Sequence, residues 1–365
     1  MSGFRSAFNF AANKVVDWRD RKKYGPREVQ LADILTRLST FPGGQDLLRR
    51  AQAMEVDISV VGRNDLKGAL GHFEATGEKP VIQIATSDNA AAMTLYLWHE
   101  LRHMLQHAAN PDGMAMGGRL RDARTAHILG TMWEADAFTA ETLTALKQKK
   151  SGHPEYFDAI LAKPEPGAHQ YIARFLQEKP YESFRDDASF SRALFTGLML
   201  DGLLSYRVGY FDHLKQDIRN SKDIGEFRDK IAKSPSGGMV LGPELMAQYG
   251  TGFTQVSSRA LATAFLRAQP FDEQSALLRV ETMVRRADRM TDPEFQKAKQ
   301  EIVSRLQDIW YKESNGYRGQ EAEAASNRLH KAAEAETPAA LSDLKPRRPA
   351  KPVKQDYSWM RRPQG

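Results

Sequence analysis

The segment with the clearest chemical potential is WHELRH at positions 98–103, an H-E-x-x-H motif inside a helical pattern. Residues four apart share one face of an α-helix, so His99 and His103 can present imidazole nitrogens to one metal ion. Glu100 is turned by about 100° from His99, which places its carboxylate beside the ion rather than on it. That position suits a general base acting on a metal-activated water. The spacing predicts a Zn²⁺ site with His99 and His103 as ligands and Glu100 as the catalytic residue.

The surroundings of the motif decide between a buried site and a solvated pair of histidines. Apolar residues flank the motif on nearly all sides of the helix, which predicts that this helix is buried. Two histidines and a glutamate in a buried helix need polar partners or a metal. The apolar flanks are Met93, Leu95, Leu97, Leu101, Met104 and Leu105.

A catalytic zinc needs three protein ligands and one open position. His107 follows His103 by four residues, but a straight helix carries it about 6 Å further along the axis. We therefore keep His107 as an alternative ligand or as a residue that orients one. The next helical stretch offers two acids among apolar neighbours, Glu134 and Asp136.

The order of elements, a helix, a strand, a hairpin and then the H-E-x-x-H helix, resembles the N-terminal subdomain of zincin metallopeptidases over about residues 45–150. The resemblance implies an edge strand, within Leu70–Ala75 or Val81–Ala85, that lies over the motif helix and pairs with extended substrate. It also implies a Tyr, His or Arg that stabilises the oxyanion. The candidates, which could equally form the polar rim of a buried helix, are Tyr206, Arg207, Tyr210 and His213.

The pattern E-x-D-A at residues 134–137, after an H-E-x-x-H helix, is similar to compact gluzincin-type metallopeptidases, many of them uncharacterised bacterial proteins. This resemblance implies that Glu134 is the third zinc ligand. Asp136 then either orients a zinc ligand without contacting the ion, or is itself the ligand while Glu134 takes the orienting role. The chain departs from well-known gluzincins at Phe138, where they place an acid. Glu321 and Glu323 in a second acidic stretch are reserve candidates.

The hydrophobic periodicity predicts an α+β fold that is mostly helical. A small N-terminal β-sheet, with strands near residues 56–60, 70–75 and 81–85, is expected to pack on the H-E-x-x-H helix, and the C-terminal half is expected to be helical. We predict four parts: a loose arm at 1–25, a zincin-like metallopeptidase core at 26–150, a helical region at 151–336 and a disordered basic Pro-rich tail at 337–365.

Composition limits the remaining possibilities. The 365 residues include no cysteine, which excludes disulfides, iron–sulfur clusters and thiol nucleophiles. The net charge of +6 is concentrated in residues 337–365, where seven Lys and Arg face two Asp. An anionic partner, if one exists, is therefore expected at this tail. The sequence shows neither a secretory signal nor an apolar run long enough for a membrane span, so we expect a cytoplasmic protein without a membrane partner.

These features lead us to predict a zinc-dependent metallopeptidase that acts on a peptide or protein substrate. The alternative is a non-catalytic zincin-like scaffold that binds other proteins. A weaker alternative is a nucleic-acid-associated protein that acts through the basic tail. The position of Glu134 discriminates between the first two, because a carboxylate far from both imidazoles would favour the scaffold.

Overall fold

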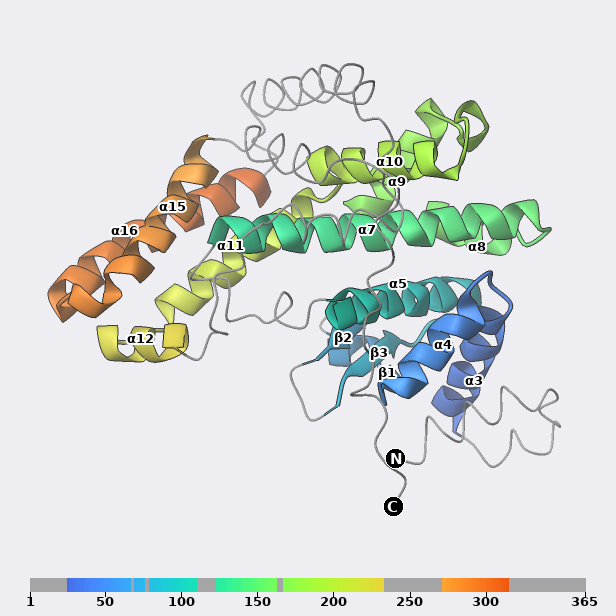
Figure 1. The fold of residues 1–365 in the computed structure, drawn as a ribbon, viewed down its shortest axis with the longest axis horizontal. Helices are drawn as coiled ribbons and strands as arrows, with labels where there is room; N and C mark the ends of the chain where they lie inside the picture. The colour runs from blue at the N-terminus through green and yellow to red at the C-terminus, as the bar shows by residue number, and fades with distance from the viewer. Residues whose placement is uncertain are drawn as a thin grey trace, which may run out of the picture.

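The computed structural model describes residues 25–66, 69–75, 79–109, 123–162, 167–232 and 271–314. It confirms the predicted α+β class, with many helices and one small sheet near the N-terminal end. Figure 1 shows α5 lying between the sheet and α7, and α7 running on toward the helices of the C-terminal half. The predicted arm, apart from Gly25, and the predicted tail lie outside the described residues.

Two helices precede the sheet, α3 (Pro26–Ser39) and α4 (Gly44–Ala53). Proline occupies the start of α3, where its missing N–H costs no hydrogen bond. The apolar side chains of α3 recur at helical spacing and are buried against α5 and the first strand. Gly43, at φ +80°, allows the tight turn between the two helices.

The sheet has three strands, β1 (Asp57–Val61), β2 (Gly71–Glu74) and β3 (Val81–Ala85), and a short 3₁₀ turn, η1 (Arg63–Leu66), follows β1. Their order is β1-β3-β2, with β1 parallel and β2 antiparallel to β3. β2 is therefore an edge strand, as the zincin resemblance implied for Leu70–Ala75. The alternative, Val81–Ala85, is wrong as an edge strand because it pairs on both sides.

The two helices that matter most for function are α5 (Ala90–Ala109) and α7 (Ala123–Lys150). Asn89 Oδ1 accepts a hydrogen bond from Ala92 N at 3.0 Å and so caps the start of α5. α5 packs on β2 and β3 with one side and on α7 with another, which explains its nearly all-round apolar sequence. Polar side chains between α5 and α7 are consequently buried.

The remaining helices build two cores. The first core surrounds α5 and extends through α8 (Glu155–Leu161), α9 (Ala168–Glu178), η2 (Tyr181–Ser183), α10 (Asp187–Gly197) and a π-helical turn, η3 (Leu198–Gly202). The second core centres on Phe211, Phe227 and Phe295. Its elements are α11 (Leu204–Arg219), α12 (Ile224–Ala232), α15 (Phe271–Arg286), η4 (Ala287–Arg289) and α16 (Asp292–Ser314).

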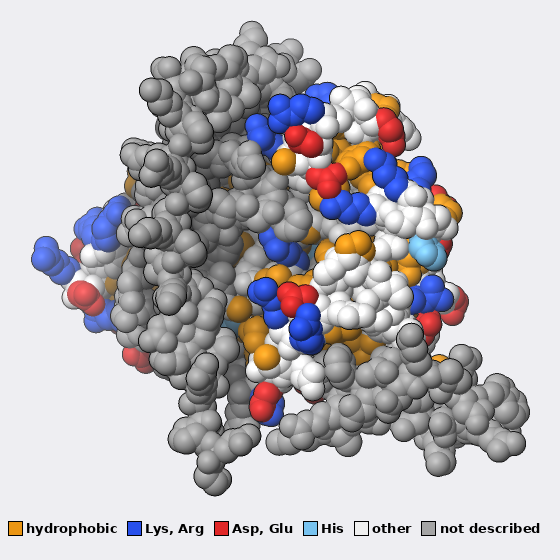
Figure 2. Space-filling view, turned by 45° about the vertical axis from the view of Figure 1, so that its right-hand side comes forward, with side chains coloured by type: hydrophobic (Ala, Val, Ile, Leu, Met, Phe, Trp, Pro, Cys, Tyr) orange, Lys and Arg blue, Asp and Glu red, His pale blue; other side chains and the backbone are white. Residues whose placement is uncertain are grey.

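The described surface carries charges of both signs. Figure 2 shows Lys and Arg side chains interspersed with Asp and Glu side chains over the described part of one face. This mixture agrees with a charge of about +1 left on residues 1–336 once the tail is set aside. No helix among the described residues combines the length and apolar composition needed to cross a membrane.

Candidate metal centre

Three side chains from α5 and α7 converge between the two helices: His99, His103 and Glu134, hereafter the HHE cluster. The Nε2 atoms of His99 and His103 are 3.1 Å apart. Glu134 Oε2 lies 3.3 Å from His99 Nε2, and Glu134 Oε1 lies 3.5 Å from His103 Nε2. The helix spacing that the sequence predicted has thus brought both imidazoles to one point, and α7 adds a carboxylate to it.

The HHE cluster fits a tetrahedral metal ion. Four atoms bonded to such an ion at roughly 2.0–2.1 Å lie about 3.3 Å from one another. The closest approaches, 3.1, 3.3 and 3.5 Å, are near that value, although the last two involve different oxygens of Glu134. One ligand atom from each residue lies within 4.8 Å of the others. The two imidazole side chains are only 9% exposed, whereas Glu134 is 22% exposed, so the cluster meets solvent on the Glu134 side. The three residues could therefore hold a metal ion.

The outward-facing nitrogen of each imidazole has an oxygen partner. His99 Nδ1 lies 3.1 Å from Glu141 Oε2, and His103 Nδ1 lies 2.8 Å from Gln106 Oε1. Both contacts are hydrogen bonds when the proton is on Nδ1, which leaves Nε2 of each ring with a lone pair for a metal. Such outer partners fix the tautomer and orientation of metal-binding histidines.

Asp136 supports the cluster from a distance. Gln106 Nε2 donates to Asp136 Oδ2 at 2.8 Å and to Trp133 O at 3.0 Å, which orients the Gln106 amide toward His103. Arg102 clamps the same carboxylate through Nε, at 2.6 Å from Oδ2, and Nη2, at 3.0 Å from Oδ1. A continuous chain of hydrogen bonds therefore runs from Arg102 through Asp136 and Gln106 to His103.

The two alternative ligands, Asp136 and His107, do not join the HHE cluster. The Asp136 carboxylate is occupied by Arg102 and Gln106. His107 lies one helical turn beyond His103, and its ring packs near Phe73 of β2 at a centroid distance of 5.8 Å. Burial lowers the pKa of His107. Asp136 is linked to His103 through Gln106, whereas His107 is a partly buried neighbour of the edge strand.

Glu100 lies between the HHE cluster and the edge strand. Its side chain is buried, and a Cβ atom placed on Gly71 of β2 would come within 2.5 Å of Glu100 Oε1. Only glycine at position 71 leaves room for the carboxylate in this position. Burial raises the pKa of Glu100, although His103 and His99 oppose that rise. A carboxylate with a raised pKa accepts protons more readily near neutral pH.

The charges of the HHE cluster are strongly coupled. Burial works to lower the pKa of His99, but the carboxylates of Glu134 and Glu141 outweigh it and raise that pKa to about 10. Burial also favours a neutral Glu134, but His103 and His99 outweigh it and lower the pKa of Glu134 to about 2. The site therefore stabilises a positive charge beside Glu134, which is what a divalent cation would supply.

The candidate oxyanion residues differ in their surroundings. Tyr206 of α11 is 42% exposed, and its ring centroid is 5.9 Å from that of Phe138, which in turn lies 4.5 Å from the His99 ring. Tyr210 instead donates a hydrogen bond to Ala123 O at the start of α7. The side chain of Arg207 and the reserve residues Glu321 and Glu323 lie outside the described part of the chain, and His213 is exposed further along α11.

Sequence reasoning missed Glu141 and Gln106. Glu141 is seven residues after Glu134, two helical turns along the same face of α7, and this spacing is the signal that could have found it. It takes over the orienting role that an acid at position 138 would have filled. Phe138 instead packs edge-on against the His99 ring. His169 of α9, 3.6 Å from Glu141 Oε1, lies beyond this carboxylate.

Replacing Glu141 by glutamine is expected to weaken metal binding about 10–100-fold, the usual cost of losing an outer partner of a metal-binding histidine. The substitution preserves the size of this buried side chain but removes the negative charge beside His99. Metal titration in competition with a chelating dye measures the effect. Glu155→Gln on α8, whose side chain is 44% exposed, is the matched control and should bind metal normally. Equal affinity in both variants would contradict the role given to Glu141.

Comparison with known proteins gives one match. The sequence model of a family described as "Putative metallopeptidase family (DUF6782)" matches residues 10–196. This stretch includes the sheet, α5, α7 and every residue of the HHE cluster. No curated protein and no solved structure matches the chain.

Proposed function

Because the chain belongs to the Putative metallopeptidase family (DUF6782), we propose that the HHE cluster binds Zn²⁺ and that the protein hydrolyses peptide bonds. The observation that carries the proposal is the convergence of one ligand atom from each of His99, His103 and Glu134 within 4.8 Å, with Glu100 next to His99 on the same helix. Two imidazoles, one carboxylate and an open fourth position form the ligand set of a catalytic zinc site.

The scaffold alternative lacks its expected support. It would gain if the Glu134 carboxylate lay far from both imidazoles, but the carboxylate is within 3.5 Å of each. The burial of Glu100 beside the cluster also favours a catalytic role, since burying a carboxylate is costly. These observations favour a catalytic metal site over a non-catalytic scaffold.

In the proposed reaction each side chain has a defined task. When bound, Zn²⁺ supplies Lewis acidity, which polarises the substrate carbonyl and acidifies water. Glu100 takes a proton from the attacking water and later delivers it to the leaving amine. Glu141 and Gln106 hold the imidazole rings. Tyr206, whose ring lies near Phe138, is the proposed hydrogen-bond donor to the developing oxyanion.

The edge strand β2 is proposed to bind the substrate. Among the described strands it pairs with β3 alone, so we propose that the backbone groups of its other edge pair with an extended peptide. Gly71 lies on this strand in contact with Glu100. A peptide added to β2 would therefore run past the catalytic carboxylate.

Metal removal tests the proposal directly. We expect the full-length protein to cleave an unfolded protein such as casein, to lose this activity on treatment with a zinc chelator and to regain it with one equivalent of Zn²⁺. Elemental analysis should find one zinc ion per chain. Proteolysis that survives complete metal removal would contradict the proposal.

Gly71→Ala is expected to lower activity about 10–100-fold while metal content stays normal, because a small displacement of a catalytic group costs up to about two orders of magnitude. The added methyl group would meet the flexible end of Glu100, so the carboxylate moves and the fold persists. Gly130→Ala on α7, where a Cβ meets no atom within 4 Å, is the control. Peptide cleavage rates and zinc analysis compare the two variants. Equal cleavage rates would show that catalysis does not depend on the glycine at position 71.

A further inference from the structure

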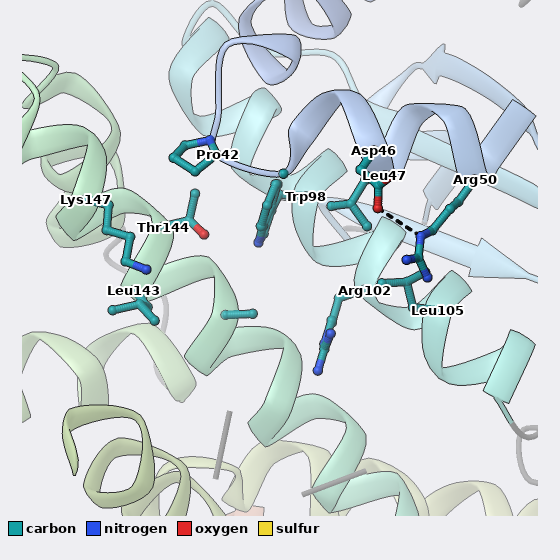
Figure 3. Close-up of a pocket in the computed structure, with 12 residues that line it drawn as sticks. Pro42, Asp46, Leu47, Arg50, Trp98, Arg102, Leu105, Leu143, Thr144 and Lys147 are labelled. Atoms are coloured by element: carbon teal, nitrogen blue, oxygen red, sulfur yellow. Dashed lines mark hydrogen bonds and ion pairs between the residues drawn. The ribbon is translucent and has the colours of Figure 1, made fainter. Parts of the chain in front are cut away.

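A second pocket lies on the other side of the interface between α5 and α7. Its volume is about 400 Å³, and α4, α5 and α7 contribute to its wall. Figure 3 shows Trp98 and Arg102 of α5 lying between Lys147 of α7 and Arg50 of α4. None of the HHE ligands lines it. The pocket is large enough for a small molecule or the end of a peptide.

The lining combines an apolar wall with cationic side chains. The apolar part is formed by Leu47, Trp98, Leu105 and Leu143. Three cations, Arg50, Arg102 and Lys147, line the pocket against a single acid, Asp46. A ligand that complements this lining has an apolar body and a negatively charged end.

Carboxylates of the protein hold the three cations in place. Arg50 Nε is 3.1 Å from Asp46 Oδ2, the pair joined by the dashed line in Figure 3. Lys147 Nζ is 2.7 Å from Asp187 Oδ2, and Arg102 is clamped by Asp136. Arg102, only 19% exposed, is the best positioned of the three before a ligand arrives, which reduces the entropy lost on binding.

Arg102 connects this pocket to the HHE cluster. It lines the pocket and also begins the hydrogen-bond chain through Asp136 and Gln106 to His103. An anion beside Arg102 competes with Asp136 for the guanidinium group. Asp136 would then lose the group that fixes its position, and the positions of Gln106 and His103 would shift with it.

We propose that this pocket binds a small amphipathic carboxylate and that its occupation weakens metal binding at the HHE cluster. A fatty acid and the C-terminal end of a hydrophobic peptide share this chemistry. The binding itself depends on neither a metal nor catalysis, so it can be tested whether or not the chain is a peptidase.

Calorimetry on the full-length chain tests the binding. The ligands are octanoate, N-acetyl-leucyl-leucine with a free carboxylate, and the amide of the same peptide. We expect at least one of the two carboxylates to bind and the amide to bind at least tenfold more weakly. The carboxylate that binds shows whether the pocket accepts a fatty acid or the C-terminal end of a hydrophobic peptide. Absence of binding by both at about 1 mM, a concentration that weak binding would still reveal, or equal binding of the amide, would overturn the proposal.

Variants locate the bound ligand. Arg50→Gln and Lys147→Gln each remove a partly exposed cation of the pocket and are expected to weaken binding about tenfold. Arg49→Gln is the matched control, because Arg49 pairs with the same Asp46 but does not line the pocket. A carboxylate bound at the HHE cluster would keep its affinity in all three variants, and this result would overturn the assignment.

A metal titration tests the coupling. We expect Zn²⁺ to bind several-fold more weakly when the carboxylate is saturating, and the carboxylate to bind more weakly by the same factor when Zn²⁺ is present. The effect should be smaller in Lys147→Gln at a ligand concentration that saturates the unmodified protein but only partly occupies this variant. Identical zinc affinity with and without bound carboxylate would overturn the coupling.

Discussion

Glu100→Gln is expected to keep a full complement of metal and to lower the rate of peptide hydrolysis about 10²–10⁴-fold, the usual contribution of a general acid–base group. Glutamine has nearly the same shape as glutamate and fits the space beside Gly71. It cannot accept a proton from water. The three ligand atoms of the HHE cluster come from other residues, so their geometry is left intact.

The measurement pairs a peptide cleavage assay with zinc analysis of the same sample. Glu155→Gln, a charge loss of the same kind at a partly exposed position of α8, should match the unmodified protein in both. If Glu100→Gln hydrolyses peptide at the full rate, Glu100 is not the base. If it loses its metal, Glu100 supports the ligand geometry, and the division of tasks proposed for α5 is wrong.

His103→Ala is expected to remove both stoichiometric zinc and hydrolysis. The substitution deletes one of three ligand atoms, and the remaining Glu134 and His99 cannot close a tetrahedral site. Gln106 Oε1 also loses His103 as its partner, so the hydrogen-bond chain from Arg102 would end at Gln106. Added zinc in excess should restore little activity, because the geometry as well as the affinity is lost.

The control for this change is His153→Ala, which removes an imidazole that is 58% exposed and distant from the HHE cluster in the chain. Thermal unfolding in the presence of a chelator shows whether each variant folds without metal. A folded His103→Ala protein that retains one zinc per chain would refute the ligand assignment, whatever its activity.

The sequence was informative where the chemistry is local. His99 and His103 face one point because helical periodicity alone places them there, and the apolar flanks correctly predicted a buried α5. Glu134 required a resemblance to a known family, since thirty residues separate it from His103. Periodicity contains no information about which face of α7 meets α5.

The contacts that sequence reasoning missed are tertiary. Glu141 reaches His99 only because α7 packs along α5 in one register, and Gln106 orients His103 only because Asp136 comes from the opposite helix. The order of strands was similarly open, because alternating burial is the same for a central and an edge strand. β2 is at the edge because β3 pairs with β1 on one side and with β2 on the other, and this pairing is visible only in the structure.

The length of α7 has a consequence for how the two halves of the molecule communicate. The helix spans 28 residues, about 42 Å at 1.5 Å per residue. Its first residue, Ala123, is buried in the second core, whereas residues from Met132 to Leu146 belong to the first. Both α15 and α11 contact α7, so a partner that bound either helix would act on the element that carries Glu134. The far end of the molecule thus has mechanical access to the metal ligands without touching them.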